Sequence, residues 1–352
     1  MGLESDHSCC DEPRKRAWYK NRLILASLAS GGLFVSGWIF PLLKPFQQSF
    51  LHYVRLTWWA LLLGFLLAGL IDRYIPSRYI SKILAHPSKR TIIYSAGLGL
   101  ILSACSHGIL AIAMQLHKKG ASGPAIISFL LGSPWANLPV TLLLVSLFKI
   151  NGFLIILSAI LVSIVTGFIF LALDRAGLIE KNKNTLTVDS DFSIGNDLKR
   201  RWNRNRAVYL HAPLKKIGSD LVLILHGSWS LANMILWWLL IGITLASLIG
   251  AFVPPTFFNN YLGRTVTGLL LTLVAATVIE ICSEGSAPLA FEIYKNTGAL
   301  GNTFAFLMGG FVTDYTEVGL VGTNLGWRTA LWMVGVALPQ VFLIGWLLNQ
   351  VF

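Results

Sequence analysis

Long apolar runs separated by short polar stretches dominate the chain. A helix needs about 20 apolar residues to cross a bilayer, because each residue rises about 1.5 Å and the hydrocarbon layer is about 30 Å thick. The apolar runs are Leu23–Leu43, Leu56–Ile71, Thr91–Leu116, Gly120–Phe148, Ile150–Leu173, Gly227–Gly263, Thr265–Ile279, Asn296–Thr313 and Thr329–Phe352. The pattern predicts an all-α polytopic membrane protein.

Composition supports this class and excludes others. Of the 352 residues, 55% are hydrophobic and 12% charged, whereas soluble proteins are about a quarter charged. Four cysteines are too few for a disulfide scaffold. The net charge of +12 comes from bases at 14–22, 72–90 and 175–216, beside apolar runs. We therefore expect a lipid bilayer as partner and no nucleic acid. No phosphate-binding glycine loop or HExxH motif occurs, so we predict neither an enzyme nor a cofactor.

Three sequence landmarks recur in the same order. The matching pairs are Trp58-Trp59 with Trp237-Trp238, Cys105-Ser106-His107-Gly108 with Cys282-Ser283-Glu284-Gly285, and Phe129–Gly132 with Phe306–Gly309. The spacing from Cys105 to Phe129 equals that from Cys282 to Phe306. The chain therefore divides into a tail (1–22), an extra N-terminal transmembrane helix (23–45), a first permease repeat (46–173), a basic linker (174–218) and a second permease repeat (219–352).

Lys and Arg set the orientation. The basic N-terminus and the loops 72–90 and 174–216 are predicted to be cytoplasmic, because positively charged loops stay inside. The second repeat then starts in the opposite direction, which predicts two inverted repeats. Residues 91–173 must also cross an even number of times. One of their three apolar runs is therefore broken or re-entrant, and which one is left open.

Gly, Pro, Ser and charged residues interrupt the apolar runs at matched places. These places are Ser103–Gly108, Gly132–Pro139, Cys282–Pro288 and Gly309–Tyr315. Non-helical backbone at membrane depth is tolerated only where protein or a watery cavity satisfies it. Paired broken helices in two inverted halves are typical of a transporter binding site near the midplane.

Candidate site residues lie at these interruptions. Cys105 and Cys282 occupy equivalent positions, and thiolates prefer soft metals and metalloids. His107 adds an imidazole. The alternative, that both cysteines are small packing residues, stays open. Acidic groups at or beside the second-repeat interruptions are Glu280, Glu284, Asp314 and Glu317, which we interpret as coupling or charge-compensating groups. Glu292, Lys295 and Arg328 are expected at the membrane surface.

The same residues resemble a known family. The predicted-permease family that includes the trivalent organoarsenical efflux permeases carries C-S-C-G and then G/S-P-x-x-N in its first half, and E-x-C-S in its second. Here these motifs read Cys105–Gly108, Ser133–Asn137 and Glu280–Ser283. The resemblance covers roughly 56–350 and points to a branch of unassigned substrate. Where the arsenical members have a second Cys, this chain has His107.

These observations and the resemblance predict a secondary-active permease. It would move a small thiophilic solute, an arsenical-like or soft metal species, by efflux. The expected substrate-binding residues are Cys105, Ser106, His107, Ser133, Asn137, Cys282 and Ser283. A transition-metal cation transporter and an uncoupled channel are the alternatives. The metal and the substrate are unknown and a homo-oligomer stays open. The expected location is a prokaryotic plasma (inner) membrane, with several spans and a cytoplasmic N-terminus.

Overall fold

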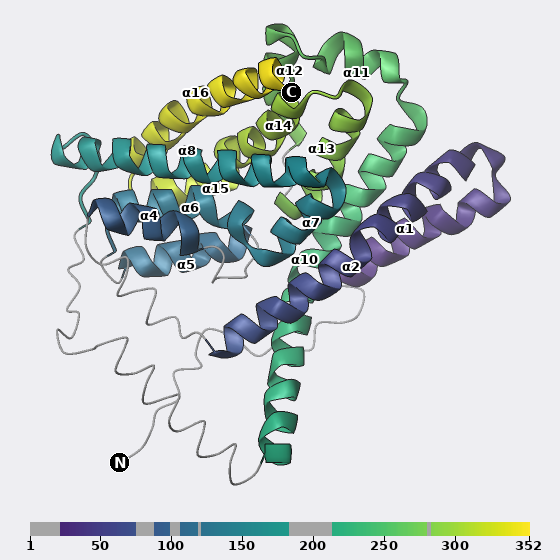
Figure 1. Cartoon of the computed structure of the whole chain (residues 1–352), viewed down its shortest axis with the longest axis horizontal. Coiled ribbons are helices and arrows are strands. Elements are labelled where there is room, and N and C mark those ends of the chain that lie inside the picture. The colour runs from purple at the N-terminus through teal and green to yellow at the C-terminus, as the bar shows by residue number, and fades with distance from the viewer. Residues whose placement is uncertain (1–21, 75–87, 99–105, 119–120, 183–212, 280–282) are drawn as a thin grey trace.

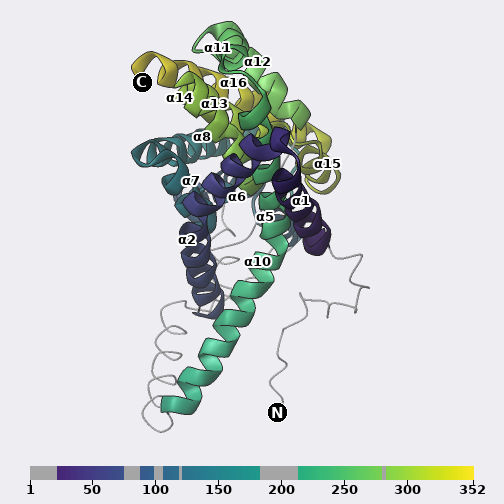
Figure 2. The ribbon, with the colours of Figure 1, turned by 90° about the vertical axis from the view of Figure 1, so that its right-hand side faces the viewer.

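The computed structural model is a bundle of helices of very different lengths, with no strand in the part of the chain that it describes (Figure 1). It describes residues 22–74, 88–98, 106–118, 121–182, 213–279 and 283–352. The long helices α2 and α10 extend away from a compact group of shorter helices (Figure 2). The all-α prediction is confirmed.

The helices follow the apolar runs. In chain order they are α1 (Arg22–Ile39), the short 3-10 turn η2 (Pro41–Leu43), α2 (Lys44–Tyr74), α4 (Lys89–Gly97), α5 (Ser106–Lys118), α6 (Gly123–Ala136), α7 (Leu138–Phe148), α8 (Ile150–Arg175), α10 (Pro213–Phe252), α11 (Pro255–Leu262), α12 (Val266–Ile279), α13 (Ser283–Thr297), α14 (Leu300–Thr313), α15 (Tyr315–Asn324) and α16 (Trp327–Val351). The run expected over Leu23–Leu43 is shorter than predicted, because the chain turns at Pro41.

Three helices are long and apolar enough to cross a membrane among the residues described. They cover Pro41–Leu67, Ile150–Arg175 and Trp327–Val351. Two bent helix pairs raise the number to five if each pair counts as one span: α6 with α7, bent by 49°, and Leu239–Phe252 with α11, bent by 104°. Large apolar side chains such as Trp38 and Val278 are more than 70% exposed. Exposed apolar surface of this extent suits lipid rather than water.

Helix starts recur at a constant shift along the chain. Helices α6, α7 and α8 begin at Gly123, Leu138 and Ile150, and helices α14, α15 and α16 begin at Leu300, Tyr315 and Trp327. Each start in the second set lies the same number of residues after its counterpart in the first set, and we call this number the constant shift. The packing recurs as well, since α6 packs between α4 and α8 just as α14 packs between α12 and α16. The two halves are therefore built from corresponding helices.

Corresponding long helices run in opposite directions. Helices α2 and α10 pack side by side (Figure 2). Gly69, near the end of α2, lies against Ile224 and Ser228, near the start of α10. At the other end of the pair, Tyr53 of α2 and Gly250 of α10 both approach Glu292. Helices α2 and α10 are thus antiparallel.

The halves also meet through their short helices. Helix α5 contacts α15, and α13 contacts α7. The hydrophobic core of the described residues includes large aromatic side chains, of which Phe129, Trp135 and Phe304 are at most 1% exposed. These contacts join helices that begin at or beside the predicted interruptions, α5 with α15 and α13 with α7.

Candidate functional site

The first helix break lies at Asn137, between α6 and α7. Pro139 cannot donate a backbone hydrogen bond, so the carbonyl of Trp135 loses its normal helical partner. The hydroxyl of Thr141 donates to that carbonyl instead, at 3.3 Å. Asn137 is fully buried and caps α7: its Oδ1 accepts the backbone N–H of Val140 at 2.8 Å, and its Nδ2 donates to the Pro134 carbonyl at 3.1 Å. This break was predicted and is confirmed.

The second break lies at Asp314, between α14 and α15, at the position that corresponds to Asn137 under the constant shift. Its Oδ1 accepts the backbone N–H groups of Thr316 at 2.7 Å and Glu317 at 3.1 Å. Asp and Asn are both favoured N-cap residues, because a short side-chain oxygen reaches the orphan N–H groups of the first turn. The same backbone device therefore occurs in both halves, neutral in one and acidic in the other.

The two breaks are neighbours in space. Trp135, just before the first break, packs edge to face against Phe311, just before the second, with ring centroids 6.3 Å apart. Two buried polar atoms near the first break, Ser133 Oγ and Trp135 Nε1, have no hydrogen-bond partner within the described residues. Buried polar atoms without partners are rare, and one explanation is a ligand that satisfies them when bound.

The motif helices α5 and α13 begin at Ser106 and Ser283, which the same shift relates. Ser283 and Glu284 are buried, and the Ser283 hydroxyl donates to Glu284 Oε2 at 3.1 Å. Glu317 is also buried, in the first turn of α15. A carboxylate in a first turn complements the partial positive charge of a helix N-terminus. The corresponding helices of the first half, α5 and α7, have no acidic residue in their first turns. Of these two pairs of helices, only α13 and α15 therefore have a carboxylate beside the positive end of the helix dipole.

Glycine allows α10 to approach the start of α13. A Cβ atom added at Gly242 would collide with the backbone of Gly285, which follows Glu284 in the second motif. No side chain fits between the two helices at this point. The long helix α10 is therefore in direct contact with the end of α13 that carries the motif.

The predicted site residues divide into three groups. Ser133, Asn137, Ser283, Glu284, Asp314 and Glu317 lie at the breaks or in the first turns just described. Ser106 and His107 begin α5, and only their helical backbone is described. Cys105, Glu280 and Cys282 lie outside the described residues. Among the described residues no group of three His, Cys, Asp or Glu side chains could hold a metal ion.

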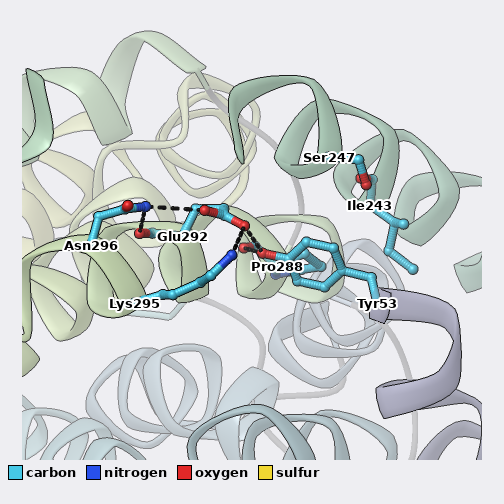
Figure 3. A network of polar contacts seen from close by, with 7 residues as sticks. All are labelled: Tyr53, Ile243, Ser247, Pro288, Glu292, Lys295 and Asn296. Atoms are coloured by element: carbon cyan, nitrogen blue, oxygen red, sulfur yellow. Dashed lines mark hydrogen bonds and ion pairs between the residues drawn. The ribbon is translucent and has the colours of Figure 1, made fainter. Parts of the chain in front are cut away.

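The sequence did not point to a second polar cluster, centred on Glu292 (Figure 3). Glu292 was expected at the membrane surface, yet its side chain is 1% exposed and surrounded by protein. The Tyr53 hydroxyl of α2 donates to its Oε1 at 2.7 Å. Lys295 and Asn296 approach it from the next turn of α13. Nothing local in the sequence indicates the contact with Tyr53.

The segment after α8 ties the two halves together. Glu180 accepts the backbone N–H groups of Arg328 and Thr329, at 3.1 and 3.0 Å, and the Thr329 hydroxyl at 2.8 Å. Burial alone would raise the pKa of Glu180, but these hydrogen bonds outweigh it and hold the pKa below its ordinary value. Asn182 donates to the carbonyl of His117, near the end of α5, and to the carbonyl of Ala121, just before α6. One short segment thus holds α16 and α5.

An all-helical bundle with apolar outer faces and paired, capped helix breaks in its interior defines a polytopic membrane protein with features of a transporter. The family described as "predicted permease" matches residues 43–214 and 220–352, nearly the whole chain. The chain belongs to this family.

Three relatives extend the comparison. UPF0718 protein YcgR of Bacillus subtilis is 23% identical over 258 residues, 72% of this chain and 80% of its own. A provisionally named permease, Rv2963 of Mycobacterium tuberculosis, is 24% identical over 287 residues, covering 78% and 68% of the two chains. UPF0718 protein MJ0584 of Methanocaldococcus jannaschii is 23% identical over 322 residues, covering 79% and 87%. No solved structure matches the chain.

Proposed function

We propose that this membrane permease is a secondary-active transporter that moves a small thiophilic solute out of the cell through a site between the broken helices. The observation that carries the proposal is the meeting of the Asn137 and Asp314 breaks through the contact between Trp135 and Phe311. A midplane site between matched broken helices is how many secondary transporters bind their solutes.

The chemistry of the solute follows from the residues around the breaks. Cys105, His107 and Cys282 would contact the solute through soft donors. Ser106, Ser133, Asn137 and Ser283 would complete its shell, and the orphan Ser133 hydroxyl supports a polar contact there. Glu280, Glu284, Asp314 and Glu317 would compensate charge. Asn137 and Asp314 also cap helices, so each would shape the site through the backbone it holds.

The two halves would be inverted repeats that rock against each other, so that the solute site opens in turn to each side of the membrane. The antiparallel pairing of α2 and α10 supports this arrangement. The proposed orientation keeps the N-terminus and the basic linker in the cytoplasm of a prokaryotic cell.

The experiment is transport into inside-out membrane vesicles that contain the full chain. A trivalent methylated arsenical and Cd²⁺ are offered in parallel, each with and without a pH gradient. We expect gradient-driven accumulation of one solute that Cys282→Ser abolishes. The matched control is Cys10→Ser, which removes a thiol from the N-terminal tail and should leave transport unchanged.

Each alternative has its own outcome in this assay. Accumulation of Cd²⁺ but not of the arsenical, lost in Cys105→Ala with His107→Ala, would indicate a transition-metal cation transporter. Flux that only dissipates a solute gradient would indicate a channel. Unchanged accumulation in Cys282→Ser would remove the thiol from the site.

A further inference from the structure

Glu292 is a buried carboxylate away from the helix breaks. It lies further along α13 than the motif residue Ser283, and its side chain is 1% exposed. An ionisable group inside a membrane protein is costly to keep, so such groups usually serve ion or proton movement.

Two hydrogen-bond donors and one ammonium group surround this carboxylate (Figure 3). The Tyr53 hydroxyl lies 2.7 Å from Oε1, the Asn296 amide nitrogen 3.1 Å from Oε2, and the Lys295 ammonium 3.5 Å from Oε1. The Lys295 side chain is 51% exposed, so one end of the cluster reaches the surface of the bundle. Gly250 of α10 also lies against this carboxylate: a Cβ there would lie 2.6 Å from Oε1.

The groups around Glu292 determine which ion its carboxylate can bind. A metal cation needs several oxygen ligands and is repelled by an adjacent ammonium group. The hydrogen-bonding partners of Glu292 are donors, and no second carboxylate approaches it among its described contacts. A proton needs only one carboxylate oxygen. The cluster therefore suits proton uptake and not sodium or a divalent cation.

Other charged groups on the surrounding helices lie further from Glu292. Helices α7, α11 and α14, which also pack on α13, contain no Asp, Glu, Lys, Arg or His. The ionisable residues of α10 fall near its start, whereas Gly250, which meets Glu292, lies near its end; they are Lys215, Lys216, Asp220 and His226.

The groups nearest the cluster have other partners or face outward. On α2, the exposed His52 ring contacts the Tyr53 ring. Arg264, between α11 and α12, donates to the carbonyl of Gly298, which lies just beyond the end of α13. Tyr294, on α13, accepts a hydrogen bond from Asn151. The direct electrostatic partner of Glu292 is thus Lys295.

We propose that Glu292 is the carboxylate that takes up and releases the coupling proton, an inference that rests on the proposed secondary-active function. The proton binds Oε1 and leaves from the same atom. Protonation removes the negative charge, which weakens both the ion pair with Lys295 and the hydrogen bond that Oε1 accepts from the Tyr53 hydroxyl. That hydroxyl has a second acceptor already in place, the Pro288 carbonyl, 3.3 Å away.

The consequence is mechanical. Tyr53 belongs to the first half, and Glu292 to the helix whose opposite end starts at the second motif. The Tyr53 ring also packs edge to face on Phe291, so contact between α2 and α13 persists while the polar tie changes. Protonation would thereby loosen α13 from α2 and change the position of Ser283 and Glu284 at the solute site.

The group is present once. The constant shift pairs Glu292 with Gln115, and the match of Trp58 to Trp237 pairs Tyr53 with Ala232; neither counterpart is acidic. Each chain would therefore exchange one proton at this cluster in each transport cycle.

The first test needs no solute. Infrared difference spectra of the purified full chain in liposomes record the C=O band of protonated carboxyl groups during stepwise acidification. We expect Glu292→Gln to remove one titrating component of that band and Tyr53→Phe to shift its midpoint. Glu180→Gln, outside the cluster, should leave that component in place. Spectra that are identical for the wild type and Glu292→Gln would overturn the proposal.

The second test separates coupling from solute binding. In inside-out vesicles, Glu292→Gln should lose pH-driven accumulation of the arsenical or Cd²⁺ and keep exchange of labelled for unlabelled solute without a gradient. Gln still accepts the Tyr53 hydroxyl, so folding is preserved. Full pH-driven accumulation by Glu292→Gln would refute the proposal. If the wild type exchanges neither solute, the proposed function fails for these probes, and the infrared titration alone decides whether Glu292 exchanges protons.

Discussion

Replacing Asp314 distinguishes its structural role from its charge. Its Oδ1 accepts two backbone N–H bonds, at 2.7 and 3.1 Å, at the break between α14 and α15. The neutral Asn137 caps the corresponding break in the first half. Asp314→Asn should therefore keep the cap and remove the charge, whereas Asp314→Ala removes both.

The magnitudes follow from the number of bonds lost. Loss of an N-cap costs about 1 kcal/mol, within a range of about 0.5–2. The charge–dipole interaction of Asp314 adds about 0.3–1 kcal/mol. Asp314→Ala should cost about 1.5–2 kcal/mol in total. Asp314→Asn should cost about 0.5 kcal/mol, because it loses the charge–dipole contribution alone.

Thermal unfolding of the detergent-solubilised chain at one fixed scan rate measures the difference. Since 1 kcal/mol corresponds to roughly 2–4 °C for a large domain, Asp314→Ala should lower Tm by several degrees and Asp314→Asn by about 1 °C. Equal losses in the two variants would refute the capping argument. The reciprocal Asn137→Asp should be more harmful than Asp314→Asn, since an ionised carboxylate cannot donate to the Pro134 carbonyl as Asn137 Nδ2 does.

Three further predictions concern other parts of the fold. Hydrogen bonds lower the pKa of Glu180 in the folded state, so its carboxylate stabilises the fold fully above the ordinary pKa of 4.5. This stabilisation is lost as the pH falls through the folded-state pKa. The difference in Tm between the wild type and Glu180→Gln should therefore shrink on acidification, and a difference independent of pH would contradict this argument. Ser133→Ala removes a buried hydroxyl that has no hydrogen-bond partner among the described residues, so it should change Tm by less than about 2 °C while weakening solute binding in the vesicle assay. A large Tm loss would mean that this hydroxyl has a partner. Gly242→Ala should destabilise the chain by about 1–3 kcal/mol, because α10 must move away from α13 to make room for the methyl group. The control Gly319→Ala has open space around it and should be neutral or slightly stabilising. Similar Tm values for the two variants would refute the close approach of α10 to α13.

Features set by local chemistry were accessible from the sequence. Pro139 removes a helical donor and Asn137 offers a cap, and both effects act within one turn of the chain. The break at Asp314 was found the same way, from glycines and a capping residue inside an apolar run. The family resemblance stated from the motifs is also borne out by the match across the chain.

Features set by distant residues were not accessible. Glu292, Lys295 and Asn296 have the spacing of a polar helix face, which normally meets water or lipid headgroups. What buries Glu292 is Tyr53, far earlier in the chain, together with the bare backbone of Gly250. The contact between Trp135 and Phe311 has the same origin, since each residue alone is an ordinary core aromatic. Local pattern cannot predict which helix of the other half covers a given face.

The constant shift between the two sets of helices has an evolutionary consequence. A symmetric dimer of one such set would repeat every side chain about its axis, so a buried carboxylate at the position of Glu292 would occur twice. Fusion of two gene copies removes that constraint. One copy can then keep Gln115 and Asn137 while the other acquires Glu292 and Asp314. A fused chain can thus evolve different charges in its halves without changing the scaffold that they share.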